Sequence, residues 1–447
     1  MLMNLSLSAA LLLAYTSAVA TAAGVITVPM KGHINTANLN PASLTKRYLH
    51  KRGVASTIPL TSANGDVMYT ISLGLGTPPQ NFNVAIDTGS PTTWVVSSQC
   101  VLGECKNITN KFNCAASSTC RQLNQSFNAT YVSGDGVLGD YVAERYTLGN
   151  MQFAAVAGSV TSNSSPLPPT VDGIMGLWYL PGRADVPFLN VIKNSTLLTE
   201  PIMGIWLETS SSLTDITAPG GEITFGGVDR SRFSGDITYI NCIKGRPWTI
   251  PVGGMNVNGK SINANGVLAT IDTGTTAMLV PEAVSNAINS AIPNSLKVAD
   301  AGGLWFIPCS GNTPITITFG GFTAKIPHQV LAMQRVRGIS NTGVDYCLSA
   351  AMFPTGTVIP IEEWLIGDVF LKNVYSVFDF GNNAENGGRI GFAQLTTSGS
   401  DGGDQKPGNG NGNADDGGLI NAASGLASTL HALQAMVLVA GLVAVVL

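Results

Sequence analysis

The chain has 447 residues, of which 45% are apolar and 11% charged, and its formal net charge is −4. That length exceeds one ordinary hydrophobic core and predicts two domains or lobes. The charged fraction is far below the roughly 25% of average soluble proteins, and the absence of a basic excess argues against nucleic acid as a partner.

The first 23 residues predict a secretory signal peptide, because a short apolar stretch ends there in small residues. Its start is not strongly basic, and the alternative is a buried helix, which fits a free N-terminus less well. Residues 24–52 are polar and end in the dibasic pair Lys51-Arg52. A dibasic pair between a signal and a strand-rich region predicts a propeptide, cleaved after Arg52, rather than a chance basic cluster.

Short apolar or alternating runs, separated by Gly, Pro, Asn and Ser, predict a mostly β chain. Residues 186–195 and 281–292 have helical character instead, and the second stretch opens with a proline, as helices often do. The clearest predicted strands are 68–76, 81–87, 139–149, 221–227, 314–321 and 375–381.

An internal duplication organises these strands. The sequence DTGS at Asp87–Ser90 is repeated as DTGT at Asp272–Thr275, and each copy directly follows apolar strand residues. Each copy is followed further along by two apolar residues and a glycine, at Ile174–Gly176 and at Leu365–Gly367. Two lobes built on one plan explain this spacing. The predicted divisions are a signal peptide (1–23), a propeptide (24–52), an N-terminal lobe (53–238), a C-terminal lobe (239–396), a flexible linker (397–421) and an anchor-signal tail (422–447).

Cysteines and sequons also fit an exported protein. Seven cysteines suit an oxidising compartment, and no Cys-x-x-Cys pair suggests a metal site. Sequence alone leaves the pairing of the first four open, and Cys242 has no obvious partner. A bridge between Cys309 and Cys347 would contribute roughly 4 kcal/mol in the chain-entropy model. The first four cysteines are Cys100, Cys105, Cys114 and Cys120, and the five Asn-x-Ser/Thr sequons begin at Asn107, Asn124, Asn128, Asn163 and Asn194.

The C-terminal region predicts a glycosylphosphatidylinositol (GPI) anchor. Residues 398–418 are rich in Gly, Asn and Asp and predict a flexible linker. Three small residues beginning at Asn421 then precede a polar spacer and the apolar tail 435–447, which is shorter than the ~20 residues needed to span a bilayer. This order is typical of a GPI signal with Asn421 as the attachment residue. The alternative is a marginal transmembrane helix.

Elimination narrows the chemistry to carboxylates. Of four histidines only His328 lies in the predicted mature chain, and no motif surrounds it, so we expect it on the surface or in a loop. A Ser-His-Asp or Cys-His catalyst needs a histidine beside its nucleophile, and a zinc site needs several His or Cys ligands. No phosphate loop or dinucleotide glycine motif is present either. We therefore expect neither a metal nor a cofactor.

The repeated aspartates suggest a different chemistry. The simpler alternative is that each aspartate only caps its own turn through an Asx-type hydrogen bond. That alternative does not explain why an apolar strand ends in a carboxylate twice. A buried unpaired carboxylate costs several kcal/mol. If Asp87 and Asp272 meet, they can share one proton, so that one acts as base towards a water and the other as acid. The glycine of each turn permits close approach, and Ser90 and Thr275 can donate hydrogen bonds to the outer oxygens.

These motifs resemble those of the pepsin-like aspartic proteases, particularly the secreted fungal members, over about residues 66–395. The two DTG turns carry the likeness, together with VDGIMGL at 171–177 and the segment 364–394. The resemblance implies a mostly β, bilobal fold of two β-barrel-like lobes with a cleft between them. It also implies that Asp87 and Asp272 are catalytic and that polypeptide substrates are hydrolysed in acid, around apolar residues.

A hairpin covers the cleft in this family and carries a tyrosine near its tip. Residues 128–142 resemble that hairpin, which implies the role for Tyr131, with Trp94 steadying it. The family usually reads Tyr-x-Asp/Thr-Gly-Ser there, whereas this chain has Ser133 and Asp135, as if the two polar residues had traded places. The resemblance assigns substrate binding to Tyr131, Ser133, Gly134, Gly89, Ser90, Gly274, Thr275, Thr276 and Ile174.

Other departures from the family concern the cysteines. Cys100 and Cys105, like Cys309 and Cys347, stand where the family has disulfides, whereas a bridge between Cys114 and Cys120 would be additional and would leave Cys242 free.

The resemblance implies a monomer. A competing interpretation is a two-lobed binding or cell-wall protein that keeps the fold without hydrolysis. Proteins of that kind usually lose an aspartate, the glycine or a residue of the hairpin, and both DTG turns are intact here.

Overall fold

The computed structural model describes most of residues 55–396. The predicted signal peptide, propeptide, linker and anchor tail lie outside the described residues, apart from two short strands at 420–421 and 444–445. Within 55–396, the positions that are not described are 102, 132–133, 181–187, 196, 211–214, 265, 300–302, 338, 340–342 and 354–362.

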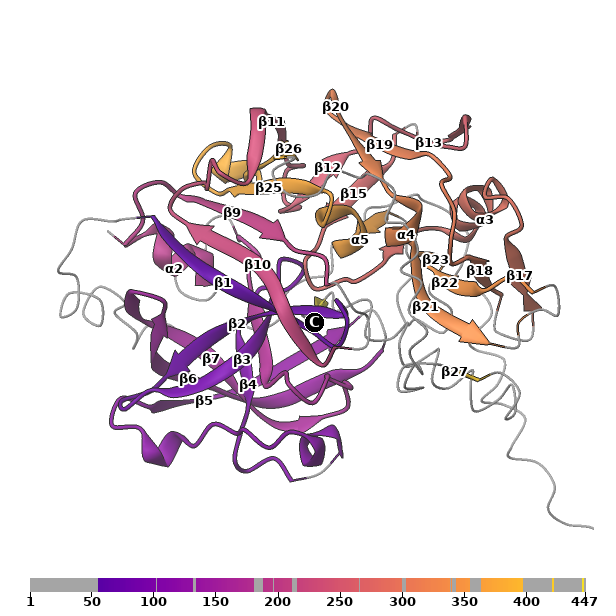
Figure 1. The fold of residues 1–447 in the computed structure, drawn as a ribbon. Coiled ribbons are helices and arrows are strands. Elements are labelled where there is room, and N and C mark those ends of the chain that lie inside the picture. The colour runs from indigo at the N-terminus through magenta and orange to yellow at the C-terminus, as the bar shows by residue number, and fades with distance from the viewer. Residues whose placement is uncertain are drawn as a thin grey trace, which may run out of the picture. The chain divides into compact units, whose positions relative to one another are not determined.

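The chain is mostly β, as the sequence predicts, and one large sheet runs through it (Figure 1). The order of its strands is β11-β26-β25-β9-β10-β1-β2-β3-β8-β4-β7-β6-β5-β28. Their bounds are β1 (Ser56–Ala63), β2 (Met68–Leu75), β3 (Gln80–Asp87), β4 (Trp94–Val96), β5 (Arg121–Tyr131), β6 (Gly136–Leu148), β7 (Met151–Asn163), β8 (Gly173–Gly176), β9 (Ile202–Leu207), β10 (Thr217–Phe225), β11 (Phe233–Asn241), β25 (Val374–Asp379), β26 (Arg389–Leu395) and β28 (Ala444–Val445).

Three smaller sheets are formed mainly by the second half of the chain, in the orders β12-β15-β24-β16-β23, β14-β13-β19-β20 and β17-β18-β22-β21-β27. The bounds are β12 (Thr249–Pro251), β13 (Gly254–Val257), β14 (Lys260–Ile262), β15 (Leu268–Ile271), β16 (Met278–Leu279), β17 (Leu296–Val298), β18 (Leu304–Pro308), β19 (Ile315–Phe319), β20 (Phe322–Ile326), β21 (Ala332–Arg337), β22 (Tyr346–Ser349), β23 (Ala351–Met352), β24 (Trp364–Ile366) and β27 (Ile420–Asn421).

The helices are short. Each predicted strand has its counterpart, and the two predicted helices are confirmed as α2 and α3, with Pro281 as the residue just before α3. No helix in the described part of the chain is both long and apolar enough to cross a bilayer. The bounds are α2 (Phe188–Lys193), α3 (Glu282–Ser290), α4 (His328–Leu331) and α5 (Asp368–Leu371), with 3₁₀ turns η2 (Gly103–Asn107), η3 (Cys114–Ala116) and η5 (Ala384–Asn386).

The duplication in the sequence corresponds to a repeated strand arrangement, which confirms the predicted bilobal class. In the first copy β3 pairs in parallel with β8, and β8 pairs antiparallel with β4. In the second copy β15 pairs in parallel with β24, and β24 pairs antiparallel with β16. β3 pairs with β2 and β8, and β15 pairs with β12 and β24, so each aspartate stands at the end of a strand that is hydrogen-bonded on both edges. The last four residues of β3, which end at Asp87, are all buried.

The glycine of each apolar-apolar-Gly segment allows the chain to pass close to the aspartyl turn. A methyl group added to Gly176 would lie 2.6 Å from the backbone nitrogen of Thr92, and one added to Gly367 would lie within the contact distance of the Thr275 carbonyl. Any side chain at either position would push the neighbouring turn away. The spacing of these segments in the sequence is thus explained by packing against the aspartyl turns.

Three disulfide bonds are present, which settles the pairing that the sequence left open. The additional bridge predicted between Cys114 and Cys120 is among them, and Cys242 is a free, buried thiol. Burial raises the pKa of the Cys242 thiol to about 12, so it stays protonated. The bridges are Cys100–Cys105, Cys114–Cys120 and Cys309–Cys347.

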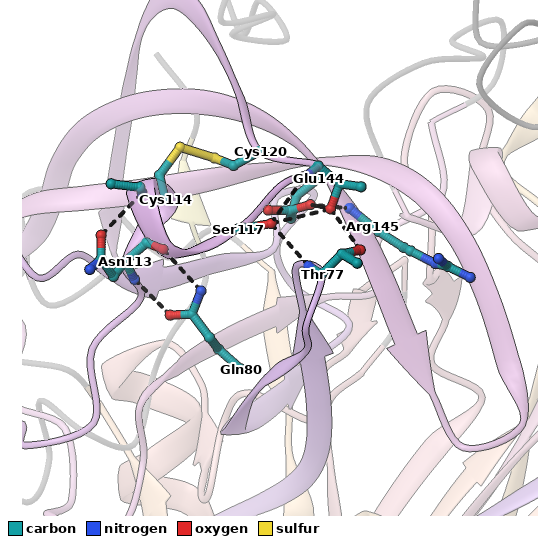
Figure 2. The surroundings of a disulfide bond; sticks show 10 residues. Thr77, Gln80, Asn113, Cys114, Ser117, Cys120, Glu144 and Arg145 are labelled. Carbon is teal, nitrogen blue, oxygen red and sulfur yellow. Dashed lines mark hydrogen bonds between the residues drawn. A yellow bond between two sulfur atoms is a disulfide. The ribbon is translucent and has the colours of Figure 1, made fainter.

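The Cys114–Cys120 bridge closes a loop that is bound to the turn between β2 and β3 (Figure 2). The backbone nitrogen of Thr77 donates to the Ser117 hydroxyl at 3.0 Å. Gln80 and Asn113 exchange two hydrogen bonds, of 2.9 and 2.8 Å, between side chain and backbone. The loop therefore holds the beginning of β3, the strand that ends at Asp87.

We expect the double variant Cys114→Ser/Cys120→Ser to lose about 2 kcal/mol of the free energy of unfolding, the loop-closure contribution of a bridge this short. The measurement is denaturant unfolding in an Asp87→Asn background, which avoids self-digestion. An unchanged free energy of unfolding would show that the surrounding hydrogen bonds hold the loop without the bridge.

The expectation of a surface or loop position for His328 is wrong. The residue begins α4, its side chain is buried, and its Nε2 lies 2.7 Å from the carbonyl oxygen of Pro308. The imidazole ring packs against Gly311. A methyl group added to that glycine would lie 2.8 Å from the ring carbon Cε1 of His328, so only glycine leaves room for the buried ring. A single histidine without a surrounding motif carries no sequence signal for such packing.

Candidate active site

The two repeated aspartates lie at the ends of β3 and β15, and both are fully buried. Asp87 is the last residue of β3, and Asp272 directly follows β15. Both side chains are 0% exposed. Two acidic side chains buried to this degree require a specific set of polar partners.

Each carboxylate receives the same pair of hydrogen bonds from its own turn. One oxygen accepts from the backbone nitrogen of the turn glycine, and the other accepts from the hydroxyl of the residue after it. The four bonds are Gly89 N to Asp87 Oδ1 (2.8 Å), Ser90 Oγ to Asp87 Oδ2 (2.5 Å), Gly274 N to Asp272 Oδ1 (2.9 Å) and Thr275 Oγ1 to Asp272 Oδ2 (2.6 Å).

The two turns meet face to face. The side chains of Asp87 and Asp272 interact electrostatically across the two turns. A methyl group added to Gly89 would lie 2.7 Å from Asp272 Oδ1, and one added to Gly274 would lie 2.5 Å from Asp87 Oδ1. Each turn thus presses its glycine against the carboxylate of the other, and only glycine fits at either position.

Two threonines that the sequence analysis did not single out lock the turns together. The backbone nitrogen of Thr88 donates to Thr273 Oγ1 (3.1 Å), and that of Thr273 donates to Thr88 Oγ1 (3.0 Å). The Thr88 hydroxyl donates to the Ile271 carbonyl (2.9 Å), and the Thr273 hydroxyl donates to that of Ile86 (3.0 Å). The available signal was the threonine present in both DTG copies, but its role becomes visible only once the turns are known to meet.

The electrostatics of the pair follow from this geometry. Burial raises the pKa of both carboxyl groups. The negative charge of Asp272 raises the pKa of Asp87 further, and the hydrogen bonds from Ser90 and Gly89 partly oppose this rise. Two carboxyl groups in contact titrate as a unit and resist carrying two charges. The arrangement therefore favours one shared proton in acid.

The predicted flap residues are brought close to the pair. Tyr131 ends β5, and the indole Nε1 of Trp94 donates to its hydroxyl oxygen at 2.7 Å. Burial, with the charge of Asp87 adding to it, raises the pKa of Tyr131, so that its hydroxyl stays protonated. The turn after Tyr131 is closed by Gly134, which donates to the Tyr131 carbonyl at 2.8 Å and has a left-handed φ of 87°. Ser133 lies outside the described residues.

The remaining predicted substrate contacts have partners within the protein. Ile174 lies in β8, is buried, and is paired with Trp94 across the sheet. Thr276 donates its hydroxyl to the carbonyl of Val67 at 2.6 Å. The Ser90 and Thr275 hydroxyls are used by the aspartates, as given above. In the part of the chain that the structure describes, no three His, Cys, Asp or Glu side chains gather as a metal site.

The five sequons differ in their exposure. Asn107, Asn124, Asn128 and Asn194 are exposed. Asn163 is buried, and its Oδ1 accepts a hydrogen bond from the backbone nitrogen of Ser165 at 2.8 Å. A glycan on Asn163 would require that side chain to leave its site.

We expect glycans on the exposed sequons and none on Asn163. Mass spectrometry of tryptic peptides, after enzymatic deglycosylation in heavy-oxygen water, marks each occupied asparagine. Full occupancy at Asn163 would contradict the buried placement of its side chain, whereas the exposed Asn128 serves as the comparison.

Comparison with known proteins agrees with this geometry. Residues 68–395 match the family described as eukaryotic aspartyl protease. The chain is 31% identical over 343 residues to a probable aspartic-type endopeptidase of Arthroderma benhamiae, covering 76% of this chain and 63% of that protein's length. It is 31% identical over 357 residues to an aspartic protease of Phaffia rhodozyma, covering 77% and 81%. It is 30% identical over 366 residues to pepsin A of Rhinolophus ferrumequinum, covering 79% and 88%.

Proposed function

Because this chain belongs to the eukaryotic aspartyl protease family, we propose that it is an endopeptidase whose catalytic pair is Asp87 and Asp272. The observation that supports this most is the close approach of the two buried carboxyl groups, which are held alike by their own turns and each lie against the glycine of the other turn. A pair that shares one proton supplies a base and an acid at the same place.

The mechanism follows from the shared proton. The ionised carboxylate takes a proton from a water held between the two groups, and that water attacks the peptide carbonyl carbon. The protonated carboxyl gives its proton to the carbonyl oxygen, so no oxyanion is left uncompensated. Breakdown of the resulting diol returns a proton to the amide nitrogen as the carbon–nitrogen bond breaks. No covalent intermediate with the enzyme forms.

The substrate is an extended peptide with apolar residues around the cleaved bond. This part of the proposal rests on the apolar cluster beside the pair, which contains Trp94, Tyr131 and Ile174. Tyr131 stands at the start of a hairpin turn, and we assign the substrate-covering flap to this hairpin because residues 128–142 resemble the flap of the family. The altered order at Ser133 and Asp135 bears on the backbone contacts of that flap and leaves both aspartates intact.

The proposal also covers the export, activation, glycosylation and membrane attachment of the protein. The chain is exported through its signal peptide, is activated by cleavage after Arg52, and is glycosylated. It acts as a monomer at the cell surface, attached through a GPI anchor at Asn421. The curated relatives include aspartic proteases of fungi, which is compatible with an exported enzyme.

Stability should depend on pH in a direction set by the buried carboxyl groups. The pKa values of Asp87, Asp272 and Asp368 are raised on folding, mainly by burial. Such groups bind protons more tightly in the folded chain, so their contribution is complete below the unfolded value of about 4 and is lost as pH rises through the folded values. We expect the unfolding temperature of the Asp87→Asn variant, which cannot digest itself and still contains Asp272 and Asp368, to fall from mild acid to neutral pH. Scanning fluorimetry over that range checks this, and a rising unfolding temperature would contradict it.

Cleavage of denatured haemoglobin or casein tests the function itself. We expect hydrolysis in acid that is blocked by pepstatin and absent in Asp87→Asn. Tight binding of the same substrates without cleavage would instead support the non-catalytic binding or cell-wall protein.

A further inference from the structure

A third buried aspartate lies beside the catalytic pair. Asp368 is the first residue of α5 and is 1% exposed. Within the described residues, neither of its carboxylate oxygens has a hydrogen-bond partner. This differs from Asp87 and Asp272, whose oxygens all receive donors from their own turns.

The nearest cation is engaged elsewhere. Lys372 follows one turn after Asp368, but its Nζ binds Asp66 Oδ2 at 3.2 Å, and both side chains of this ion pair are nearly or fully buried. Asp66 also accepts hydrogen bonds from the Ser62 hydroxyl (2.6 Å) and the backbone nitrogen of Ser210. The direct contact of Lys372 is thus to Asp66, and its charge acts on Asp368 only without a hydrogen bond.

The groups that face Asp368 come from four segments. Asp272 lies at the end of β15, Asp66 lies between β1 and β2, and Lys372 follows α5. Tyr69 of β2 also interacts with Asp368 and Asp66, and its hydroxyl donates to the Glu208 carbonyl at 3.0 Å. Burial raises the pKa of Asp368, the charges of Asp272 and Asp66 add to the rise, and Lys372 opposes it.

The backbone of α5 is bonded to the second catalytic turn. The backbone nitrogen of Asp368 donates to the Thr275 carbonyl (2.8 Å), and that of Val369 donates to the Thr276 carbonyl (3.0 Å). Thr275 in turn donates its hydroxyl to Asp272. A charge on Asp368 would have no hydrogen-bond donor, and Asp272 and Asp66 would repel it while Lys372 attracts it. Supplying donors to that charge requires α5 to shift, and the turn bonded to α5 shifts with it.

Two ionisations can end activity as pH rises: loss of the proton shared by Asp87 and Asp272, or loss of the proton of Asp368. We propose that Asp368 is a pH-sensitive positioning residue: neutral in acid, it lets α5 hold the Asp272 turn in place, and its ionisation sets the upper pH limit of the enzyme. This inference rests on the proposed protease function and identifies which buried group limits its pH range.

The test compares Asp368→Asn with Asp236→Asn, a matched removal of one carboxylate at an exposed position. We expect the alkaline limb of the kcat/KM profile of Asp368→Asn to move up by at least about half a pH unit. Its half-life of irreversible inactivation at neutral pH should lengthen at least about threefold. Asp236→Asn should behave as the wild type. Asp368→Ser, which is also neutral at every pH, repeats the test if the asparagine variant folds poorly.

A second readout does not need activity. In the Asp87→Asn background, Asp368→Asn should raise the unfolding temperature at neutral pH while leaving it equal or lower in acid. A purely structural role predicts the same loss at both pH values and would overturn the proposal. An alkaline limb that is unchanged or moves down would overturn it too, because the dyad proton would then be lost first. If no variant cleaves peptides but the unfolding temperatures behave as stated, the protease function fails and the pH-sensitive support stands.

Discussion

Asp87→Asn and Asp272→Asn should each lower kcat for peptide hydrolysis by at least about 10⁴-fold. Asparagine keeps the size of the side chain and its oxygen can accept one of the two hydrogen bonds from the turn, but it cannot share a proton with the other aspartate. Because water activation and protonation of the carbonyl oxygen depend on one shared proton, the loss of either aspartate removes both. The measurement is the cleavage rate of a fluorogenic peptide in mild acid.

Asp236→Asn is the control for this pair of variants, because it removes a carboxylate that is exposed and distant in the sequence. Unfolding curves show whether the inactive variants are folded. A folded Asp272→Asn that keeps activity within about tenfold of the wild type would remove Asp272 from the mechanism.

Gly274→Ala and Gly89→Ala should each lower kcat by roughly 100-fold without unfolding the chain, since a displacement of about 1 Å at a reacting group has this effect. The added methyl group would lie 2.5 Å from Asp87 Oδ1 in the first variant and 2.7 Å from Asp272 Oδ1 in the second. Both distances are shorter than carbon and oxygen atoms tolerate, so the carboxylates must separate. A wider gap weakens the interaction between the two carboxyl groups and their hold on one proton.

Gly254→Ala is the matched control, because a methyl group there meets no atom within 4 Å. Its activity and unfolding should equal those of the wild type. Unchanged kcat in Gly274→Ala would show that the pair tolerates separation, and it would contradict the close approach of the two turns.

The large features of this molecule could be predicted from the sequence, because they repeat. The DTG copies and the apolar-apolar-Gly segments indicated two similar lobes, and the structure has the same parallel and antiparallel pairing at β3-β8-β4 and at β15-β24-β16. Local patterns also sufficed for the strands and for α3, whose start is marked by Pro281. Periodicity and turn residues are properties of neighbouring positions, and a sequence displays them directly.

Two features that depend on contacts between distant segments were not predicted. The crossed hydrogen bonds of Thr88 and Thr273 join residues 185 positions apart. Asp368 is buried without a hydrogen-bond donor, and the nearby Lys372 binds Asp66, which lies 306 positions before Lys372 in the sequence. Asp368 follows Gly367, and from the sequence alone it is an ordinary first residue of a helix. The neighbouring residues do not indicate that its side chain would bind a proton.

The pH dependence of peptide cleavage tests the central claim most directly. One short fluorogenic peptide is cleaved by the wild type under kcat/KM conditions from about pH 3 to about pH 8. Two buried carboxyl groups that work with one proton predict a bell-shaped profile, with its maximum in acid and little activity remaining at neutral pH. A rate that stays level across this range, or that increases towards neutral pH, would contradict a proton shared between Asp87 and Asp272.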